Sequence, residues 1–203
     1  MAVHTIYLVR HGQYDTRVAN QDELEGDLTV VGREQARLTG ERLRGLGVQR
    51  LYSSDLRRAV STAAAVATVM GEKSWPQDRL LRECFPYFPL GYESLLLESG
   101  YTMTQIVADK AQAEQAFARY FQPVEEESLV DVIVCHGNLI RYFVCRVLGI
   151  PITGWLDMGT YNCGVTTVQI KENGDRRLYG FNDVGHLPAE LVTHNMVVGP
   201  RGI

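Results

Sequence analysis

The sequence predicts an α/β fold with three layers, in which helices cover both faces of a mainly parallel, mixed sheet. Two observations lead to this prediction. Short apolar runs rich in β-branched residues, typical of buried strands, alternate with longer segments whose apolar residues recur at helical spacing. Near the end of the chain, Asn173 and Gly174 separate two such short runs, a pattern that is typical of a β-hairpin and adds an antiparallel edge.

Six segments are predicted to be strands. The runs 5–9 and 130–135 are almost entirely apolar, as expected of buried strands. Pro76 places the run 75–80 at an edge, because proline lacks the N–H that a central strand donates. The other three predicted strands are 49–53, 165–171 and 177–181.

Four segments are predicted to be helices. Thr29 can cap the first, and Gly47 follows its end. Gly71 follows an alanine-rich second helix in the same way. The predicted helices cover residues 29–46, 55–70, 102–121 and 138–148. Residues 84–100 contain two prolines and several aromatic residues and are predicted to form an irregular flap.

Length and composition indicate a single domain that covers residues 1–203 and has ample sequence for a full core. A formal net charge of −4 argues against a nucleic-acid surface. No apolar run approaches the roughly 20 residues of a membrane span, and the N-terminus lacks the pattern of a signal peptide. We therefore expect a cytoplasmic protein that binds neither nucleic acid nor membranes. Its four cysteines show no C-x-x-C spacing and are expected to be free thiols.

Two histidines follow predicted buried strands, and arginines accompany them. His11 comes directly after Arg10 at the end of the first strand, and His136 directly follows the strand at 130–135. Ligands of open α/β sheets bind beyond the carboxyl ends of the strands, so both histidines can meet over one ligand. Arg58 follows another strand. Imidazole is a competent nucleophile near neutral pH, and arginine offers a rigid donor fork for phosphate oxygens. The pattern indicates covalent chemistry on a phosphoryl group, with no metal site.

Five segments in this order resemble the signature of the histidine phosphatase superfamily, which includes cofactor-dependent phosphoglycerate mutases and many phosphatases. The matching segments are Leu8-Val9-Arg10-His11-Gly12, Leu28-Thr29 with Gly32, Gln35 and Ala36, Ser53-Ser54 with Arg58-Ala59 and Thr62-Ala63, Leu81-Arg82-Glu83, and Cys135-His136-Gly137-Asn138. The likeness runs from Ile6 to about Gly164 and implies a phosphoglycerate mutase-like fold.

The resemblance implies a role for each candidate residue. His11 would be the nucleophile, transiently phosphorylated on a ring nitrogen. Arg10, Arg58 and His136 would surround the phosphoryl group. Glu83 would protonate the leaving oxygen and later take a proton from water. No cofactor is implied.

Departures from the mutase pattern favour the phosphatase branch. Mutases of the family carry Glu and Asn where this chain has Gln13 and Arg17, which we add as further candidates for binding phosphate. Segments near the C-terminus, including Tyr161-Asn162-Cys163-Gly164 and Leu191-Val192-Thr193, resemble a protein Ser/Thr phosphatase of the family.

The expected activity is therefore hydrolysis of a phosphomonoester through a phosphohistidine, on a phosphoprotein or a small phosphorylated molecule. Mutase-type phosphotransfer and a catalytically silent binding module of the same fold are the alternatives. The sequence leaves a homo-oligomer open. The aromatic residues that follow Glu83 either border the mouth of the site or pack the flap onto the domain.

Overall fold

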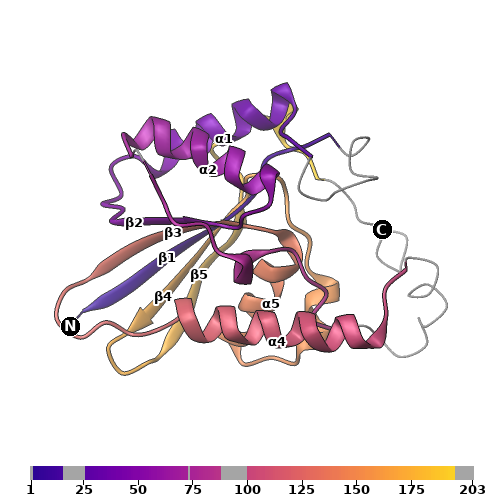
Figure 1. The fold of residues 1–203 in the computed structure, drawn as a ribbon. Coiled ribbons are helices and arrows are strands. Elements are labelled where there is room, and N and C mark those ends of the chain that lie inside the picture. Colours follow the sequence, from indigo (N-terminus) through magenta and orange to yellow (C-terminus); the bar gives the residue numbers. More distant parts are fainter. Residues whose placement is uncertain (1, 16–25, 73, 88–99, 195–203) are drawn as a thin grey trace.

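The computed structural model describes residues 2–15, 26–72, 74–87 and 100–194. Within these residues, five strands form a mixed sheet of order β2-β3-β1-β4-β5 (Figure 1). The strands are β1 (Val3–Arg10), β2 (Arg50–Ser53), β3 (Leu129–Cys135), β4 (Val165–Lys171) and β5 (Arg176–Asp183). Strands β1, β2 and β3 run parallel, whereas β4 and β5 form the predicted antiparallel hairpin at one edge.

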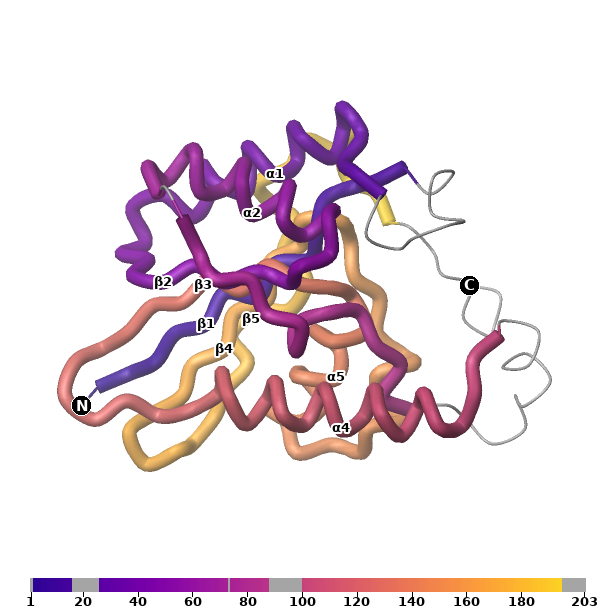
Figure 2. Tube along the Cα trace, viewed as in Figure 1, coloured from indigo at the N-terminus to yellow at the C-terminus, as the bar shows by residue number. Residues whose placement is uncertain are grey.

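Helices cover both faces of the sheet, which confirms the predicted three-layer α/β fold (Figures 1 and 2). Helices α1 and α2 lie on one face, and α4 and α5 lie on the other. The helices are α1 (Val30–Leu43), α2 (Arg57–Met70), α4 (Met103–Tyr120) and α5 (Gly137–Leu148). Thr29 caps α1 as predicted, because its hydroxyl accepts a hydrogen bond from the Gly32 backbone N–H at 3.0 Å.

The apolar pattern of β1 explains why a hydrophobic core forms on each face of the sheet. Successive side chains of a strand point to opposite faces. Ile6 and Leu8 are fully buried in the cluster formed with α4 and α5, and Val9 is buried with the alanine-rich face of α2. Because both faces are covered, the strand reads as a nearly continuous apolar run, typical of a parallel sheet.

The predicted edge strand over residues 75–80 is wrong. Gln77 forms only an isolated parallel bridge with Ser53. The chain then enters a short 3₁₀ helix (Arg79–Leu81), where the Asp78 carboxylate accepts a hydrogen bond from the Leu80 N–H at 2.9 Å. An aspartate two residues after Pro76 favours such a local turn over a strand, because its side chain satisfies the backbone itself. Residues 88–99 of the predicted flap lie outside the described residues.

The parallel strands end side by side at one edge of the sheet. Arg10 pairs with Cys135 in the register of β1 and β3, and Ser53 pairs with Val134 in that of β2 and β3. The His11 N–H continues this ladder by donating to the Cys135 carbonyl at 2.9 Å. The residue that follows each strand is thus delivered to the same place, as the rule for open α/β sheets requires.

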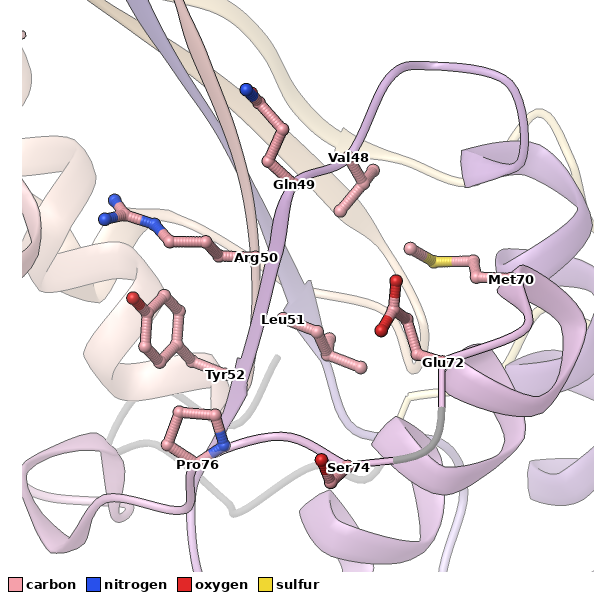
Figure 3. A pocket seen from close by; sticks show the side chains of 9 residues that line it. All are labelled: Val48, Gln49, Arg50, Leu51, Tyr52, Met70, Glu72, Ser74 and Pro76. Atoms are coloured by element: carbon pink, nitrogen blue, oxygen red, sulfur yellow. The ribbon is translucent and has the colours of Figure 1, made fainter.

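A surface pocket of about 250 Å³ lies along the outer edge of β2 (Figure 3). Met70, the last residue of α2, and Glu72, just beyond the helix, point toward Leu51 in this pocket. Arg58 stands at the opposite end of the same helix, roughly 18 Å away for 12 residues at 1.5 Å rise. The pocket therefore takes no part in the cluster of histidines and arginines. Among the described residues, no helix has the length and apolar character needed to cross a membrane.

Candidate active site

His11 lies fully buried just beyond the end of β1, and its hydrogen bonds define its tautomer. Its Nδ1 lies 2.9 Å from the Gly12 carbonyl oxygen, which can only accept, so Nδ1 carries the proton. In the neutral ring this leaves the lone pair on Nε2. The Arg58 Nε–H donates to that atom at 3.3 Å. The free electron pair of the predicted nucleophile therefore faces an arginine.

The loop that carries His11 is fixed by close backbone packing against the start of α1. A Cβ added to Gly12 would lie 2.6 Å from the Gly32 carbonyl oxygen. A Cβ added to Gly32 would lie 1.9 Å from the Gln13 carbonyl oxygen. The Gly12 N–H also donates to the Thr62 hydroxyl of α2 at 3.0 Å. Both glycines are thus required for the approach of the loop to the two helices.

Two arginines from different elements converge on the buried imidazole. Arg58 lies in the first turn of α2 and is buried, with its guanidinium carbon 4.9 Å from the centre of the Tyr14 ring. The same tyrosine ring meets His11 edge-on, with 5.3 Å between ring centres. Arg10 ends β1, is also buried, and donates from Nη1 to the Thr160 carbonyl. The side chains are thus held by packing as well as by hydrogen bonds.

His136 forms the second wall of this cluster. It is fully buried at the N-cap position of α5, and its ring centre lies 5.1 Å from that of His11. Its Nε2 lies 3.0 Å from the hydroxyl of Ser54, which follows β2. Its Nδ1 is buried with no hydrogen-bond partner among the described residues. That nitrogen can therefore bond to a ligand.

Glu83 approaches the same place from the loop after the 3₁₀ helix. One carboxylate oxygen accepts a hydrogen bond from the backbone N–H of Asn138 at 3.1 Å. Asn138 stands in the first turn of α5, where backbone N–H groups favour a negative charge. Its side-chain oxygen accepts from the guanidinium of Arg141, which stacks on Trp155 with 4.4 Å from the guanidinium carbon to the ring centre.

Burial and charge shift the pKa values of these groups in directions that suit their predicted roles. Burial lowers the pKa of His11 well below its usual value, and the charges of Arg58 and Arg10 lower it further. Burial, with Arg58 next, also lowers the pKa of His136. Both imidazoles are therefore neutral near pH 7. Burial raises the pKa of Glu83, opposed by the positive charges of Arg58, Arg10 and then Arg141.

The structure brings together the predicted residues Arg10, His11, Arg58, Glu83 and His136. The two other candidates are placed differently. Gln13 accepts a hydrogen bond on its side-chain oxygen from the Thr29 hydroxyl at 2.7 Å, which ties it to the cap of α1, and its role at the phosphate stays a prediction. Arg17 lies outside the described residues.

Several supporting residues were not assigned a role from the sequence. Ser54, Thr62 and Gln35 stood within the matched motifs, which was the available signal, but spacing alone did not reveal their partners. Tyr14 had no such signal, because only the packing of His11 against Arg58 shows why an aromatic ring is there.

The described part of the chain contains no group of three His, Cys, Asp or Glu side chains arranged to hold a metal ion. Metal independence stays a prediction that activity measurements must test.

Comparisons with known proteins agree with this geometry. Residues 6–86 and 101–184 match the histidine phosphatase superfamily (branch 1). Over 199 residues the chain is 34% identical to the mitochondrial serine/threonine-protein phosphatase PGAM5 of Mus musculus, covering 96% of this chain and 67% of that protein. A phosphoglycerate mutase structure from Plasmodium falciparum superposes with a TM-score of 0.62 and 28% identity, covering 96% of this chain and 100% of the other.

A phosphoserine phosphatase of Entamoeba histolytica, solved with phosphoserine, has the same fold, with a TM-score of 0.70 and 22% identity over 91% of this chain and 100% of that one. The predicted cytoplasmic location is wrong: the PGAM5 relatives from mouse and Caenorhabditis elegans are mitochondrial proteins. That prediction rested on the absence of a signal-peptide pattern and of an apolar run long enough to span a membrane, and neither absence bears on mitochondrial placement. The family match over most of the chain, the PGAM5 relatives and the converging histidines and arginines together show that this chain is a phosphatase of the histidine phosphatase superfamily, branch 1.

Proposed function

We propose that the chain hydrolyses phosphomonoesters through a phosphohistidine at Nε2 of His11. One observation carries the proposal. The His11 ring is held with its proton on Nδ1 and its lone pair on Nε2, directed into a cluster of buried arginines. A neutral imidazole in this tautomer is ready to attack an electrophile, and the arginines supply the charge that attracts a phosphate dianion.

In the first step, Nε2 of His11 attacks phosphorus and forms the N–P bond as the P–O bond to the leaving group breaks. The protonated carboxyl of Glu83 donates its proton to the departing oxygen, so an alcohol is released. Burial favours this protonated state because it raises the pKa of the carboxyl. The hydrogen bond from the Asn138 N–H fixes one oxygen of the carboxyl and thereby orients the other.

In the second step, water attacks phosphorus and the N–P bond breaks. Glu83, now a carboxylate, takes the proton from water, which returns both it and His11 to their starting states. Inorganic phosphate leaves. Dividing the reaction in this way replaces one difficult displacement by two easier ones.

Charge on the transferred group is stabilised by donors that are already in place. The phosphoryl group carries charge on three equatorial oxygens, so positioning and electrostatics dominate the catalysis. Arg10 and Arg58 contribute guanidinium donors. The buried Nδ1 of His136 contributes a further hydrogen bond, provided that the ring carries its proton on that atom while Nε2 accepts from the Ser54 hydroxyl.

We favour phosphoserine or phosphothreonine in a protein as the substrate class. Support comes from the relatives in mouse and Caenorhabditis elegans, which are serine/threonine-protein phosphatases. Mutase-type transfer is the second candidate, since a phosphoglycerate mutase shares the fold at 28% identity. The two differ in the acceptor, which is water in one case and a phosphorylated small molecule in the other.

The test is a comparison of phosphate release with phosphoryl exchange. Purified protein is given phosphoserine and phosphothreonine peptides, p-nitrophenyl phosphate and 3-phosphoglycerate, with His11→Ala as the control. We expect phosphate release from the peptides at a higher kcat/KM than from 3-phosphoglycerate, and none from the variant. Interconversion of phosphoglycerates faster than phosphate release would support the mutase instead. Retained activity in His11→Ala would refute the covalent mechanism.

A further inference from the structure

The segment of residues 187–193, called here the C-terminal segment, is connected to the loop of His11 through two buried amide side chains. Gln35, on α1, and Asn162, in the loop before β4, are both fully buried. Gln35 donates from Nε2 to the Leu191 carbonyl and to the Thr193 hydroxyl, at 2.6 and 2.8 Å. Asn162 donates its backbone N–H to the Thr193 carbonyl at 2.8 Å. Figure 1 shows this last described segment, in yellow, beside α1.

These bonds form a relay that begins and ends on the loop of the nucleophile. The Gln13 N–H donates to Gln35 Oε1 at 2.8 Å, and Gln35 Nε2 donates to the Thr193 hydroxyl at 2.8 Å. That hydroxyl donates to Asn162 Oδ1 at 3.1 Å. Asn162 Nδ2 then donates to the His11 carbonyl at 3.1 Å. Every donor in the series meets an acceptor.

The hydroxyl of Thr193 closes this relay because it accepts one hydrogen bond and donates another. The backbone N–H of Gln13 must donate and the carbonyl of His11 must accept, which fixes the orientation of both amides. The group between them must therefore accept from the NH₂ of one amide and donate to the oxygen of the other. A threonine or serine hydroxyl does both, whereas valine, which has nearly the same shape as threonine, does neither.

We propose that Thr193 is a positioning residue for His11, so that the C-terminal segment is part of the machinery that holds the nucleophile. Packing supports this inference independently of the hydrogen bonds. Val192 and Leu187 lie in one apolar cluster with Leu28 and Tyr14. Tyr14 is the ring that contacts both His11 and Arg58. The segment thus touches the nucleophile through polar and apolar neighbours.

The inference rests on the proposed nucleophilic role of His11 for its kinetic consequences only. Thr193→Val is compared with Thr193→Ser, which keeps the hydroxyl. Thr5→Val is the matched control, because Thr5 also accepts a side-chain hydrogen bond, from Gln169 at 3.3 Å, but lies at the other end of β1.

We expect Thr193→Val to slow formation of the phosphoenzyme by about 10- to 100-fold, because a misplacement of about 1 Å of a reacting group can cost about 100-fold. Binding of inorganic phosphate depends on the arginines, so its dissociation constant should change less than about threefold. That change is smaller than the loss of one hydrogen bond of about 1 kcal/mol would cause. Thr193→Ser should restore the rate, and Thr5→Val should leave it unchanged. If Thr193 had a merely structural role, Thr193→Val would reduce the phosphorylation rate and phosphate binding together, or the rates of the three variants would vary with their thermal stability.

Amide hydrogen exchange provides a readout that does not require activity. Exchange of the Gln13 N–H should be about fivefold faster in Thr193→Val than in the wild type, which corresponds to one hydrogen bond of about 1 kcal/mol. It should return to the wild-type rate in Thr193→Ser. If the wild type shows no phosphoenzyme, the proposed function fails, and exchange still decides the role of Thr193. Unchanged exchange and an unchanged phosphorylation rate in Thr193→Val would each overturn the inference, as would equal impairment in Thr193→Ser.

Discussion

Replacing Glu83 by glutamine separates proton transfer from binding. The glutamine side chain keeps an oxygen that can accept from the Asn138 N–H, so the group should stay in place. It cannot donate the acid proton. Glutamine is neutral, as is the protonated carboxyl that acts as the acid, so the positive charge that Arg58 and Arg10 present to a phosphate dianion is unchanged and affinity for that dianion should hold.

The expected loss therefore lies in kcat and depends on the leaving group. General acid catalysis contributes about 10²- to 10⁴-fold, or about 2.7 to 5.4 kcal/mol at 1.36 kcal/mol per tenfold. Glu83→Gln should lose this factor with an alkyl phosphate such as phosphoserine, whose leaving oxygen is strongly basic. It should lose little with p-nitrophenyl phosphate, whose leaving group departs without a proton.

The raised pKa of Glu83 also predicts how the rate depends on pH. Burial, opposed by Arg58 and the other arginines, raises the pKa of Glu83, so the protonated acid persists toward higher pH than for an ordinary glutamate. The kcat/KM for alkyl phosphates should fall as the pH rises through that pKa, and Glu83→Gln should lose this limb. Steady-state kinetics on both substrates makes the measurement, from about pH 4, near the ordinary value for a glutamate, up to about pH 9, which covers the raised pKa. Equal slowing of the two substrates, or a rise in KM without a fall in kcat, would refute the acid role.

Three further predictions concern the guanidinium of Arg58, the stability of the fold and the dependence of activity on a metal. Arg58→Lys should keep the charge yet lose most of the activity, because an ammonium cannot replace the planar donor fork; near wild-type kcat/KM in this variant would show that charge alone suffices. Asp131→Ala should lower the free energy of unfolding by about 1 to 3 kcal/mol, since it leaves the buried ring of His4 without its hydrogen-bond partner, whereas the half-exposed guanidinium of Arg50 can turn to solvent; urea titration measures this, and no measurable loss would contradict it. Activity should survive EDTA, and vanadate should inhibit; loss of activity in EDTA that a divalent cation restores would show that a metal is required.

The arrangement of the strands could be predicted largely because the periodicity is strong. Buried parallel strands read as apolar runs, and the position of Arg10-His11 and His136 at their ends predicted where they meet. The cap at Thr29 was predicted in the same way, from a residue type whose side chain satisfies the first turn.

Where prediction from the sequence was wrong or impossible, the cause was either a local side-chain interaction or a contact between distant segments. Around Pro76 and Asp78, side-chain capping outweighed the weak strand pattern, and the edge strand did not form. The partners of Gln35 and Asn162 could not be predicted, because they join segments more than 100 residues apart in the chain. Gln13 resembled a substrate residue by position, whereas its side-chain oxygen bonds to Thr29.

The chemical identity of the phosphorylated atom tests the proposed phosphohistidine mechanism most directly. The wild-type protein is mixed briefly with labelled substrate, quenched in alkali and hydrolysed under base, and the two phosphohistidine isomers are separated against standards. We predict the isomer phosphorylated on Nε2, at His11, because Nδ1 of that ring donates to the Gly12 carbonyl and Nε2 faces Arg58. Label on Nδ1, on another residue, or in an acid-stable ester would contradict it.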